Sequence, residues 1–509
     1  MILAVLLLVL IAGALVSIAA AKINNSLPRY IALMALAIDI VILLGAWNLS
    51  AFPTLFKNGI WMYQFHAEWI PTIGASFDLA MDGLSFLMIL LTLALGFIAV
   101  MASPKTEQEG FYYFNTLLMM AGVTGIFLAT DLLLFFFFWE MMLVPLYLLM
   151  VMFGKEKGSR TSVKFLIYTQ ASGLLMLFSI LGMYVANGRY TGIYSFAYTD
   201  VFAVNYGIKL GSILVLGFLA AFFVKLPIIP FHGWLPGAFV EAPVTAVITG
   251  LLIKTGAYGL IRFALPLFPD VSALFAHTAM LIGIITIFYG AFMAFTKTDL
   301  RLIAAYSGIS HMGFIILGLY SFNEIALQGV IVQMIASAIS TSALVLIASS
   351  LLKRTGTCDI NQLGGLWEKT PVLSGLGVFF AMAALGLPGM GNFIAEYLIL
   401  AGTFKVSAVS AIIASLGLIA AAAYSLRIIQ KVFVGNKNND WQIPDFSVIE
   451  KITLGSLVVL IIWIGLYPQP IINRSKAAIE RTLNVQQTGD KDAPTNVNKN
   501  EASVKAKLQ

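Results

Sequence analysis

Long stretches of apolar residues constrain this chain more than any other feature of its sequence. A helix needs about 20 predominantly apolar residues to cross the hydrocarbon core of a bilayer, and the 509 residues contain fourteen such stretches between polar breaks. Because 60% of the residues are hydrophobic and only 11% are charged, a soluble domain and a disordered chain are excluded. The stretches do not alternate polar and apolar residues, as barrel strands would. The sequence therefore predicts an all-α integral membrane protein with about 14 transmembrane helices.

The basic residues predict how these helices are oriented. Most lysines and arginines of the connecting segments follow odd-numbered helices, and basic residues are retained on the cytoplasmic side of a membrane. We therefore expect both termini on the outer side. The formal net charge of +6 reflects this orientation and gives no reason to expect a nucleic-acid partner. The last polar segment, 474–509, is predicted to be a disordered tail.

Several kinds of site are excluded by residue type. The single thiol, Cys358, cannot hold an iron–sulfur cluster or form an internal disulfide. The four histidines lack metal-ligand spacing, and no glycine-rich nucleotide motif is present. We therefore expect no cofactor and no metal in this chain, so that any redox or nucleotide chemistry belongs to another subunit.

We single out five ionisable residues inside the apolar stretches, where a charge costs roughly 2.5 kcal/mol or more. Such residues usually face the interior of a helix bundle and one another. Any one of them could be structural, His311 most easily, but five in separate helices favour a common function. They are Glu140, Lys225, Lys254, His311 and Glu396.

Two of the five adjoin segments that interrupt a helix. KLPIIPFHGWLP (225–236) begins at Lys225, and LGLPGMGN (385–392) precedes Glu396. Proline and glycine break helices, and broken membrane helices often border an ion path, although a plain proline kink is the alternative. We expect Glu140 and Lys225 to form a coupled pair, with Lys254, His311 and Glu396 passing a proton onward.

These segments resemble a known family. FFFFWEMMLVPLYLLM, KLPIIPFHGWLP, LLIKTGAYGLIRF, SHMGFIILG, GNFIAEYLIL and GLYPQP are similar to the subunit M family of bacterial proton-translocating NADH–quinone oxidoreductase, respiratory complex I, whose mitochondrial counterpart is ND-four. The related L and N subunits and Mrp-type antiporter subunits share parts of the pattern. By motif, Glu140 is the helix 5 glutamate, Lys225 its helix 7 partner, Lys254 the central lysine and Glu396 the exit-side glutamate.

The resemblance implies an architecture and a setting. Helices 4–8 and 9–13 would be inverted five-helix repeats, with helices 7 and 12 broken. NADH, FMN, iron–sulfur clusters and quinone would be bound by other subunits, and the partners would be L- and N-type subunits in the bacterial inner membrane, with both termini periplasmic. The expected divisions are residues 1–110 (helices 1–3), 111–264 (first repeat), 265–430 (second repeat), 431–473 (last helix) and 474–509 (tail).

The chain departs from the family pattern at a few positions. Gly237 and Phe239 stand where polar residues are frequent, Ser337 where a histidine is common, and Leu302 where a second basic residue is usual. These departures leave other functions open: a cation/proton antiporter subunit, a membrane-hydrogenase subunit, or a structural spacer that pumps nothing. A stand-alone transporter is disfavoured because no organic-substrate site is indicated.

Overall fold

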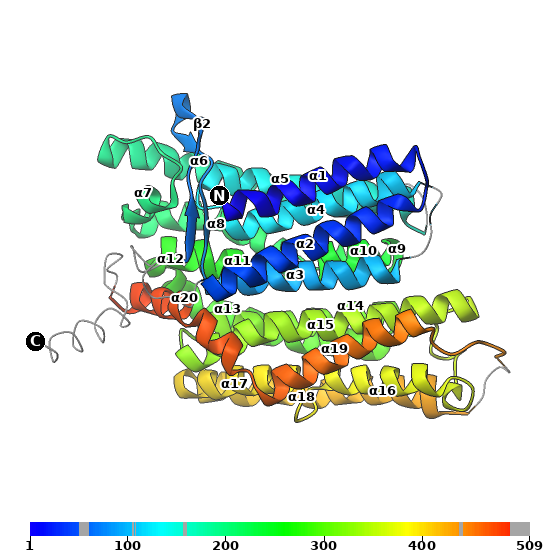
Figure 1. The fold of residues 1–509 in the computed structure, drawn as a ribbon. Coiled ribbons are helices and arrows are strands. Elements are labelled where there is room, and N and C mark those ends of the chain that lie inside the picture. Colours follow the sequence, from blue (N-terminus) through cyan, green and yellow to red (C-terminus); the bar gives the residue numbers. More distant parts are fainter. Residues whose placement is uncertain (50–60, 104–105, 107, 156–159, 437–440, 489–509) are drawn as a thin grey trace, which may run out of the picture.

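The computed structural model describes residues 1–49, 61–103, 106, 108–155, 160–436 and 441–488. Within these ranges, thirteen helices are long and apolar enough to cross a membrane. Figure 1 shows them side by side, with their axes roughly aligned. The predicted all-α membrane class is therefore confirmed. The helices before the first break are α1 (Ile2–Ala21), α2 (Leu27–Leu49), α3 (Gly83–Ala102), α4 (Glu109–Leu128), α5 (Leu132–Phe153) and α6 (Arg160–Thr191).

Helix 7 is broken, as its sequence predicts. It consists of α8 (Gly207–Lys225) and the short α9 (Leu235–Glu241), with irregular backbone between them. Helix 8 is also interrupted, which was not predicted, although Gly250, Gly256 and Gly259 flank the position. Its parts are α10 (Val244–Ala246), a π-helical turn η3 (Val247–Leu251), α11 (Thr255–Gly259), a second π-helical turn η4 (Leu260–Ala264) and α12 (Leu265–Leu267).

The second predicted break, at residues 385–392, separates α16 from α17. α16 and α17 have 15 and 16 residues, so neither is long enough to span a bilayer alone. Together they form helix 12, a broken crossing that brings the number of crossings to fourteen, with Gly386 in the left-handed region at φ +81°. The elements are α13 (Pro269–Thr296), α14 (Leu300–Tyr320), α15 (Glu324–Thr355), η5 (Leu366–Glu368), α16 (Pro371–Leu385), α17 (Gly391–Val406), α18 (Ala408–Ile428), η6 (Ile429–Val434) and α19 (Val448–Leu466).

Short strands and helices gather at one end of the bundle, which is also the end where α1 begins (Figure 1). Strand β1 pairs antiparallel with β4, placing Tyr63 opposite Met81, and β2 pairs antiparallel with β3. These elements are β1 (Tyr63–Phe65), β2 (Glu68–Ile70), η2 (Pro71–Ile73), β3 (Ala75–Ser76), β4 (Leu79–Met81) and α7 (Tyr198–Ala203).

The segment from residue 474 was predicted to be disordered, and for its first part that prediction is wrong. Helix α20 runs from Gln469 to Thr488 and packs on α3 and α15 at the same end of the bundle (Figure 1). The reason is an amphipathic pattern: Ile471, Ser475, Ala478 and Ile479 recur at helical spacing and are buried. The rest of the predicted tail, 489–509, lies outside the described residues.

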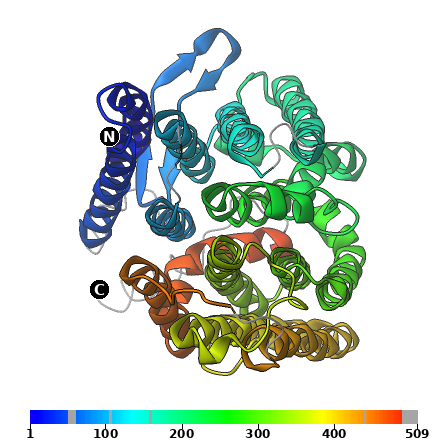
Figure 2. The same cartoon turned by 90° about the vertical axis from the view of Figure 1, so that its right-hand side faces the viewer.

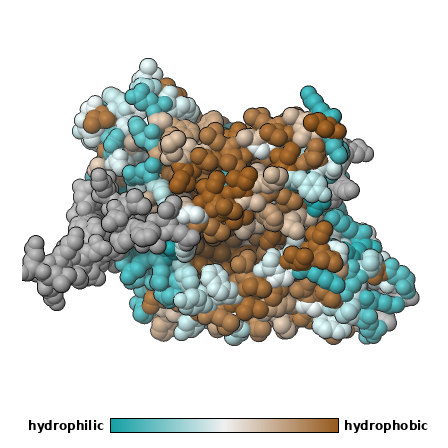
Figure 3. Space-filling view, in the orientation of Figure 1, coloured by the Kyte–Doolittle hydropathy of each residue, from teal (hydrophilic) through white to brown (hydrophobic). Residues whose placement is uncertain are grey.

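Figure 2 views the bundle along its helices, with the blue-to-cyan helices on one side, the yellow-to-orange helices on the opposite side and the red helix α20 between them. The central helix is α15, whose most apolar window is entirely buried. On the outer surface, Figure 3 shows a broad apolar region between hydrophilic ends. Lipid-facing and protein-facing surfaces are therefore both apolar, and the polar residues of the interior stand out as candidates for function.

Candidate functional site

Lys225 is the last residue of α8 and is buried at the break in helix 7. Because the helix ends here, the carbonyl of Val224 has no helical donor, and the indole Nε1 of Trp234 donates to it over 3.0 Å. The Lys225 ammonium has no hydrogen-bond partner among the described residues. Trp234 of the HGWLP motif thus satisfies a free carbonyl at the break, whereas the Lys225 ammonium has no partner among the described residues.

Lys254 lies at the interruption of helix 8. Its backbone, at φ −84° and ψ 51°, is outside the helical region, and α11 starts at the next residue. A Cβ built on Gly256 would stand 2.6 Å from the carbonyl oxygen of Phe222 and 3.0 Å from the nitrogen of Leu226. Only glycine permits this approach, so the segments that carry Lys225 and Lys254 pack directly against each other.

Glu140 is half-buried in α5, and its carboxylate faces α6. A Cβ on Gly173 would stand 2.7 Å from Oε1 of Glu140, and the Gln170 side chain hydrogen-bonds to the carboxylate. Glu140 and Lys225 are not among the ion pairs of the described chain, because Glu140 points toward α6 rather than α8, and their coupling stays a prediction. The two helices are nonetheless neighbours, since the rings of Trp139 and Phe222 lie 5.7 Å apart.

His311 and Glu396 form a buried hydrogen-bonded pair. Nδ1 of His311 in α14 lies 2.9 Å from Oε1 of Glu396 in α17, and both side chains are nearly inaccessible. Gln333 of α15 joins them, with its Nε2 3.0 Å from His311 Nδ1 and 3.4 Å from Glu396 Oε1. Sequence reasoning missed Gln333, because an uncharged amide in an apolar stretch gives no signal comparable to a charge.

The polar neighbours of this pair come from the helix break and from α15. A Cβ on Gly386 would stand 2.9 Å from Oε2 of Glu396, so the break provides the space that the carboxylate occupies. Asn392 donates to the hydroxyl of Ser340 over 3.0 Å. Ser337, which stands where a histidine is common, uses its hydroxyl to donate to the Gln333 carbonyl over 2.6 Å, so its bond stays within its own helix.

Arg262 lies inside helix 8 rather than in the segment that follows it. It lies in η4 within the helix, where its guanidinium donates to the carboxylate of Asp82 over 2.5 Å, with both side chains 5% exposed. Burial alone would raise the pKa of Asp82, but Arg262 and the N–H of Ser85 hold it below its usual range. The hydroxyl of Tyr258 also accepts from Arg262. The arginine could have been recognised from its position inside the apolar stretch.

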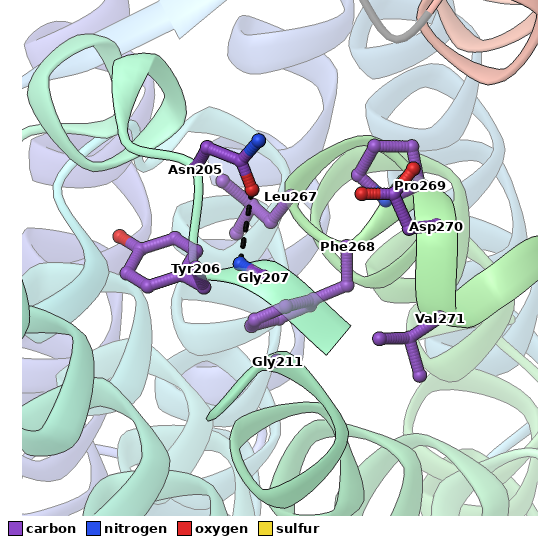
Figure 4. Close-up of a pocket in the computed structure, with 9 residues that line it drawn as sticks. All are labelled: Asn205, Tyr206, Gly207, Gly211, Leu267, Phe268, Pro269, Asp270 and Val271. Carbon is purple, nitrogen blue, oxygen red and sulfur yellow. Dashed lines mark hydrogen bonds between the residues drawn. The ribbon is translucent and has the colours of Figure 1, made fainter. Parts of the chain in front are cut away.

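A small cavity lies away from these residues, between the first turn of α8 and the start of α13 (Figure 4). Its volume is about 20 Å³, which is room for about one water molecule. Asn205 accepts a hydrogen bond from the N–H of Gly207 at its edge. None of the five predicted residues lines it, so it is not a candidate for the proton path.

Comparisons with known proteins decide the family. Residues 129–421 match the family described as "NADH:quinone oxidoreductase/Mrp antiporter, TM". NADH-quinone oxidoreductase subunit M of Pseudomonas aeruginosa is 44% identical over 90% of this chain and 92% of its own length. The same subunit of Escherichia coli K12 is 41% identical over the same shares. This chain belongs to the subunit M family of NADH-quinone oxidoreductase.

Solved structures agree with membership of the subunit M family. A chain of respiratory complex I from Thermus thermophilus superposes with a TM-score of 0.85 at 28% identity, over 96% of this chain and all of its own. A chain of the Mrp complex from Dietzia gives 0.81 at 22% identity, over 97% of this chain and 53% of its own, which shows the shared fold. The resemblance inferred from the motifs is therefore confirmed, and the chain is an antiporter-like membrane subunit of an enzyme complex.

Proposed function

We propose that this member of the subunit M family translocates protons across the bacterial inner membrane by way of Glu140, Lys225, Lys254, His311 and Glu396. The work would come from NADH oxidation and quinone reduction in other subunits, which would hold the NADH, FMN, iron–sulfur and quinone sites. L- and N-type antiporter-like subunits are the proposed membrane partners. Both termini are proposed to be periplasmic, in keeping with the common end at which Met1 and α20 lie (Figure 1).

The observation that carries this proposal is the coincidence of buried charge with broken helix. Lys225 ends α8, Lys254 lies at the interruption of helix 8, and Glu396 fills the space beside Gly386. Unpaired backbone groups at membrane depth are tolerated where protein or water surrounds them. Charges held at such places can exchange protons with water, while the apolar helices around them prevent leakage.

The five residues fall into two groups. Glu140, Lys225 and Lys254 belong to α5, α8 and the interrupted helix 8, whereas His311 and Glu396 belong to α14 and α17. In the first group, Glu140 would change the proton affinity of Lys225 through the field between neighbouring helices rather than through a hydrogen bond. In the second group, His311 and Glu396 would exchange a proton directly across their 2.9 Å contact.

Replacing single carboxylates in the assembled complex tests the proposal. Glu140→Gln and Glu396→Gln would be compared with Glu68→Gln, which changes an exposed carboxylate on β2. NADH-driven acidification of inverted membrane vesicles and NADH oxidation would be measured, with assembly checked on native gels. We expect both rates to fall by roughly a hundredfold in the first two variants, the scale of a lost proton-transfer group, and to stay unchanged in the third.

Other outcomes would point elsewhere. Normal acidification in both test variants, with the complex assembled, would mean that this subunit is a spacer and that the proposed path is wrong. Acidification that requires sodium ions would instead favour cation/proton exchange, an alternative in keeping with the antiporter named in the family description.

A further inference from the structure

The amide of Gln333 lies against both members of the His311–Glu396 pair. Its Nε2 lies 3.0 Å from Nδ1 of His311 and 3.4 Å from Oε1 of Glu396, and these two atoms lie 2.9 Å apart. All three side chains are buried. Oε1 of Gln333 and Nε2 of His311 have no hydrogen-bond partner within the described residues. One NH₂ group therefore faces the atoms between which the proposed proton transfer occurs.

The hydrogen bonds that Gln333 can donate depend on the protonation state of the His311–Glu396 pair. When Nδ1 of His311 carries a proton, it donates to Glu396, and Gln333 can donate only to the carboxylate. When the proton has moved to Glu396, the N–H bond is broken, an O–H bond is formed, and both residues are neutral. When that proton then leaves Glu396, a neutral imidazole nitrogen and a carboxylate oxygen face each other as two acceptors with no proton between them.

This last, proton-depleted state is the one that Gln333 fits best. An amide NH₂ has two N–H donors, so one can bond to Nδ1 of His311 and the other to Oε1 of Glu396. The reversed amide would place its own oxygen against both acceptors. In a buried site an acceptor without a donor is destabilising, so the two N–H groups offset a cost that the empty pair would otherwise bear.

We propose that Gln333 is a positioning residue that stabilises the proton-depleted state of the His311–Glu396 pair and so promotes release of the proton. This inference rests on the proposed function, because it assumes that the pair carries protons. Gln333 gains and loses no proton itself. By supplying donors to both acceptors once the proton has gone, it makes the empty pair a stable intermediate rather than one that recaptures the proton at once.

Another titratable group near the His311–Glu396 pair could also change how the pair binds protons. Among the described residues, Tyr424 of α18 is a further titratable side chain that interacts electrostatically with Glu396. Its hydroxyl is buried and comes from a different helix. Replacing Tyr424 with Phe therefore separates a general electrostatic change at Glu396 from the specific loss of the Gln333 donors.

The test is the pH dependence of pumping by the complete complex. Gln333→Met keeps the length and bulk of the side chain but removes both donors. Gln328→Met makes the same change on the same helix, where the amide instead donates to Glu324. NADH-driven acidification of inverted vesicles would be recorded over the range in which histidine changes charge, about pH 5 to 8, with Tyr424→Phe measured alongside.

We expect the pH optimum of Gln333→Met to move upward by about one unit, the effect of a lost charge-assisted hydrogen bond on a proton-binding pair. Gln328→Met and Tyr424→Phe should keep the parent optimum. If Gln333→Met does not assemble, Gln333→Leu is read instead; it also lacks both N–H donors and adds no titratable group, and the same upward shift is expected. An unchanged optimum in the assembled variant would overturn the inference.

Failure of the inference and failure of the proposed function are distinguishable. If Glu396→Gln abolishes acidification while Gln333→Met has the parent pH profile, the path stands and only the role of Gln333 is wrong. If Glu396→Gln pumps normally, the path through the pair is wrong, and Gln333 has no proton to help release.

Discussion

Gly386 provides the space in which the carboxylate of Glu396 lies. A Cβ on Gly386 would stand 2.9 Å from Oε2 of Glu396, closer than carbon and oxygen pack. The glycine also adopts φ +81°, a conformation that costs other residues about 1–2 kcal/mol. Two constraints therefore favour glycine at position 386: the backbone conformation of the helix 12 break, and the space that the Glu396 carboxylate needs.

The first prediction concerns that position. Gly386→Ala should reduce NADH-driven acidification by roughly a hundredfold, because the new methyl group pushes the Glu396 carboxylate away from His311. Gly389→Ala is the matched control: Gly389 also has a positive φ, of +91°, but a Cβ there would meet nothing within 4 Å. Equal losses in both variants would mean that backbone strain, and not displacement of Glu396, is responsible.

The second prediction concerns the buried pair of Asp82 and Arg262. Removing one partner of a buried ion pair costs about 3–5 kcal/mol, because the other charge is left unpaired. Arg262→Met should therefore lower the thermal stability of the subunit strongly. The double variant with Asp82→Asn should recover much of the loss, since it leaves no unpaired charge. Melting curves of the purified complex followed on this subunit provide the measurement.

The same pair gives a pH dependence with a defined sign. Because the folded pKa of Asp82 lies below its ordinary value, its contribution to stability is complete above the unfolded pKa, about 3.9. It is lost as the pH falls through the lower folded pKa. In the Arg262→Met variant this acid-dependent contribution should disappear. A parent and variant whose stabilities fall in parallel below about pH 4 would contradict the assignment.

The third prediction concerns Asp39 of α2, which is fully buried while both carboxylate oxygens lack a hydrogen-bond partner in the described structure. Asp39→Leu should raise the stability of the subunit, because an unsatisfied buried polar group costs about 1–3 kcal/mol. Pumping should not change. Loss of acidification in an assembled, more stable Asp39→Leu complex would instead place Asp39 among the proton-carrying residues.

The fourth prediction concerns Cys358, which lies in the segment between α15 and α16. Burial raises the pKa of the Cys358 thiol to about 11, and its Sγ lies 3.4 Å from the carbonyl oxygen of Ala348. Since the thiolate is the reactive form, labelling with a maleimide at neutral pH should be slow and should accelerate as the pH rises. Asn361→Cys in a Cys358→Ser background, an exposed site on the same segment, is the fast control, read by peptide mass spectrometry.

Much of this architecture could be predicted because membrane helices are defined by length and composition. The apolar stretches, the helix 7 and helix 12 breaks, and the burial of Lys225, Lys254, His311 and Glu396 all follow from local sequence. The inverted repeats stay a prediction. By the same criterion Asp39 and Arg262 could have been found, since each is a charged residue inside an apolar stretch.

The partners of these residues could not be predicted, because sequence specifies the helix on which a side chain lies but not the face it presents in the bundle. Glu140 faces Gly173 of α6 instead of Lys225. Gln333 meets His311 and Glu396 only because α14, α15 and α17 converge. The order of α20 depends on its packing against α3 and α15, which its polar composition conceals.

Helix α15 has a consequence for how the chain is synthesised in the membrane. The helix has 32 residues and is about 48 Å long. Its most apolar window is entirely surrounded by protein. Its neighbours α17, α19 and α20 come later in the chain. A nascent chain that ends after α15 therefore lacks Glu396 and Asn392, the α17 partners of Gln333 and Ser340. We expect a chain truncated before α17 to be degraded rather than retained as a half-subunit.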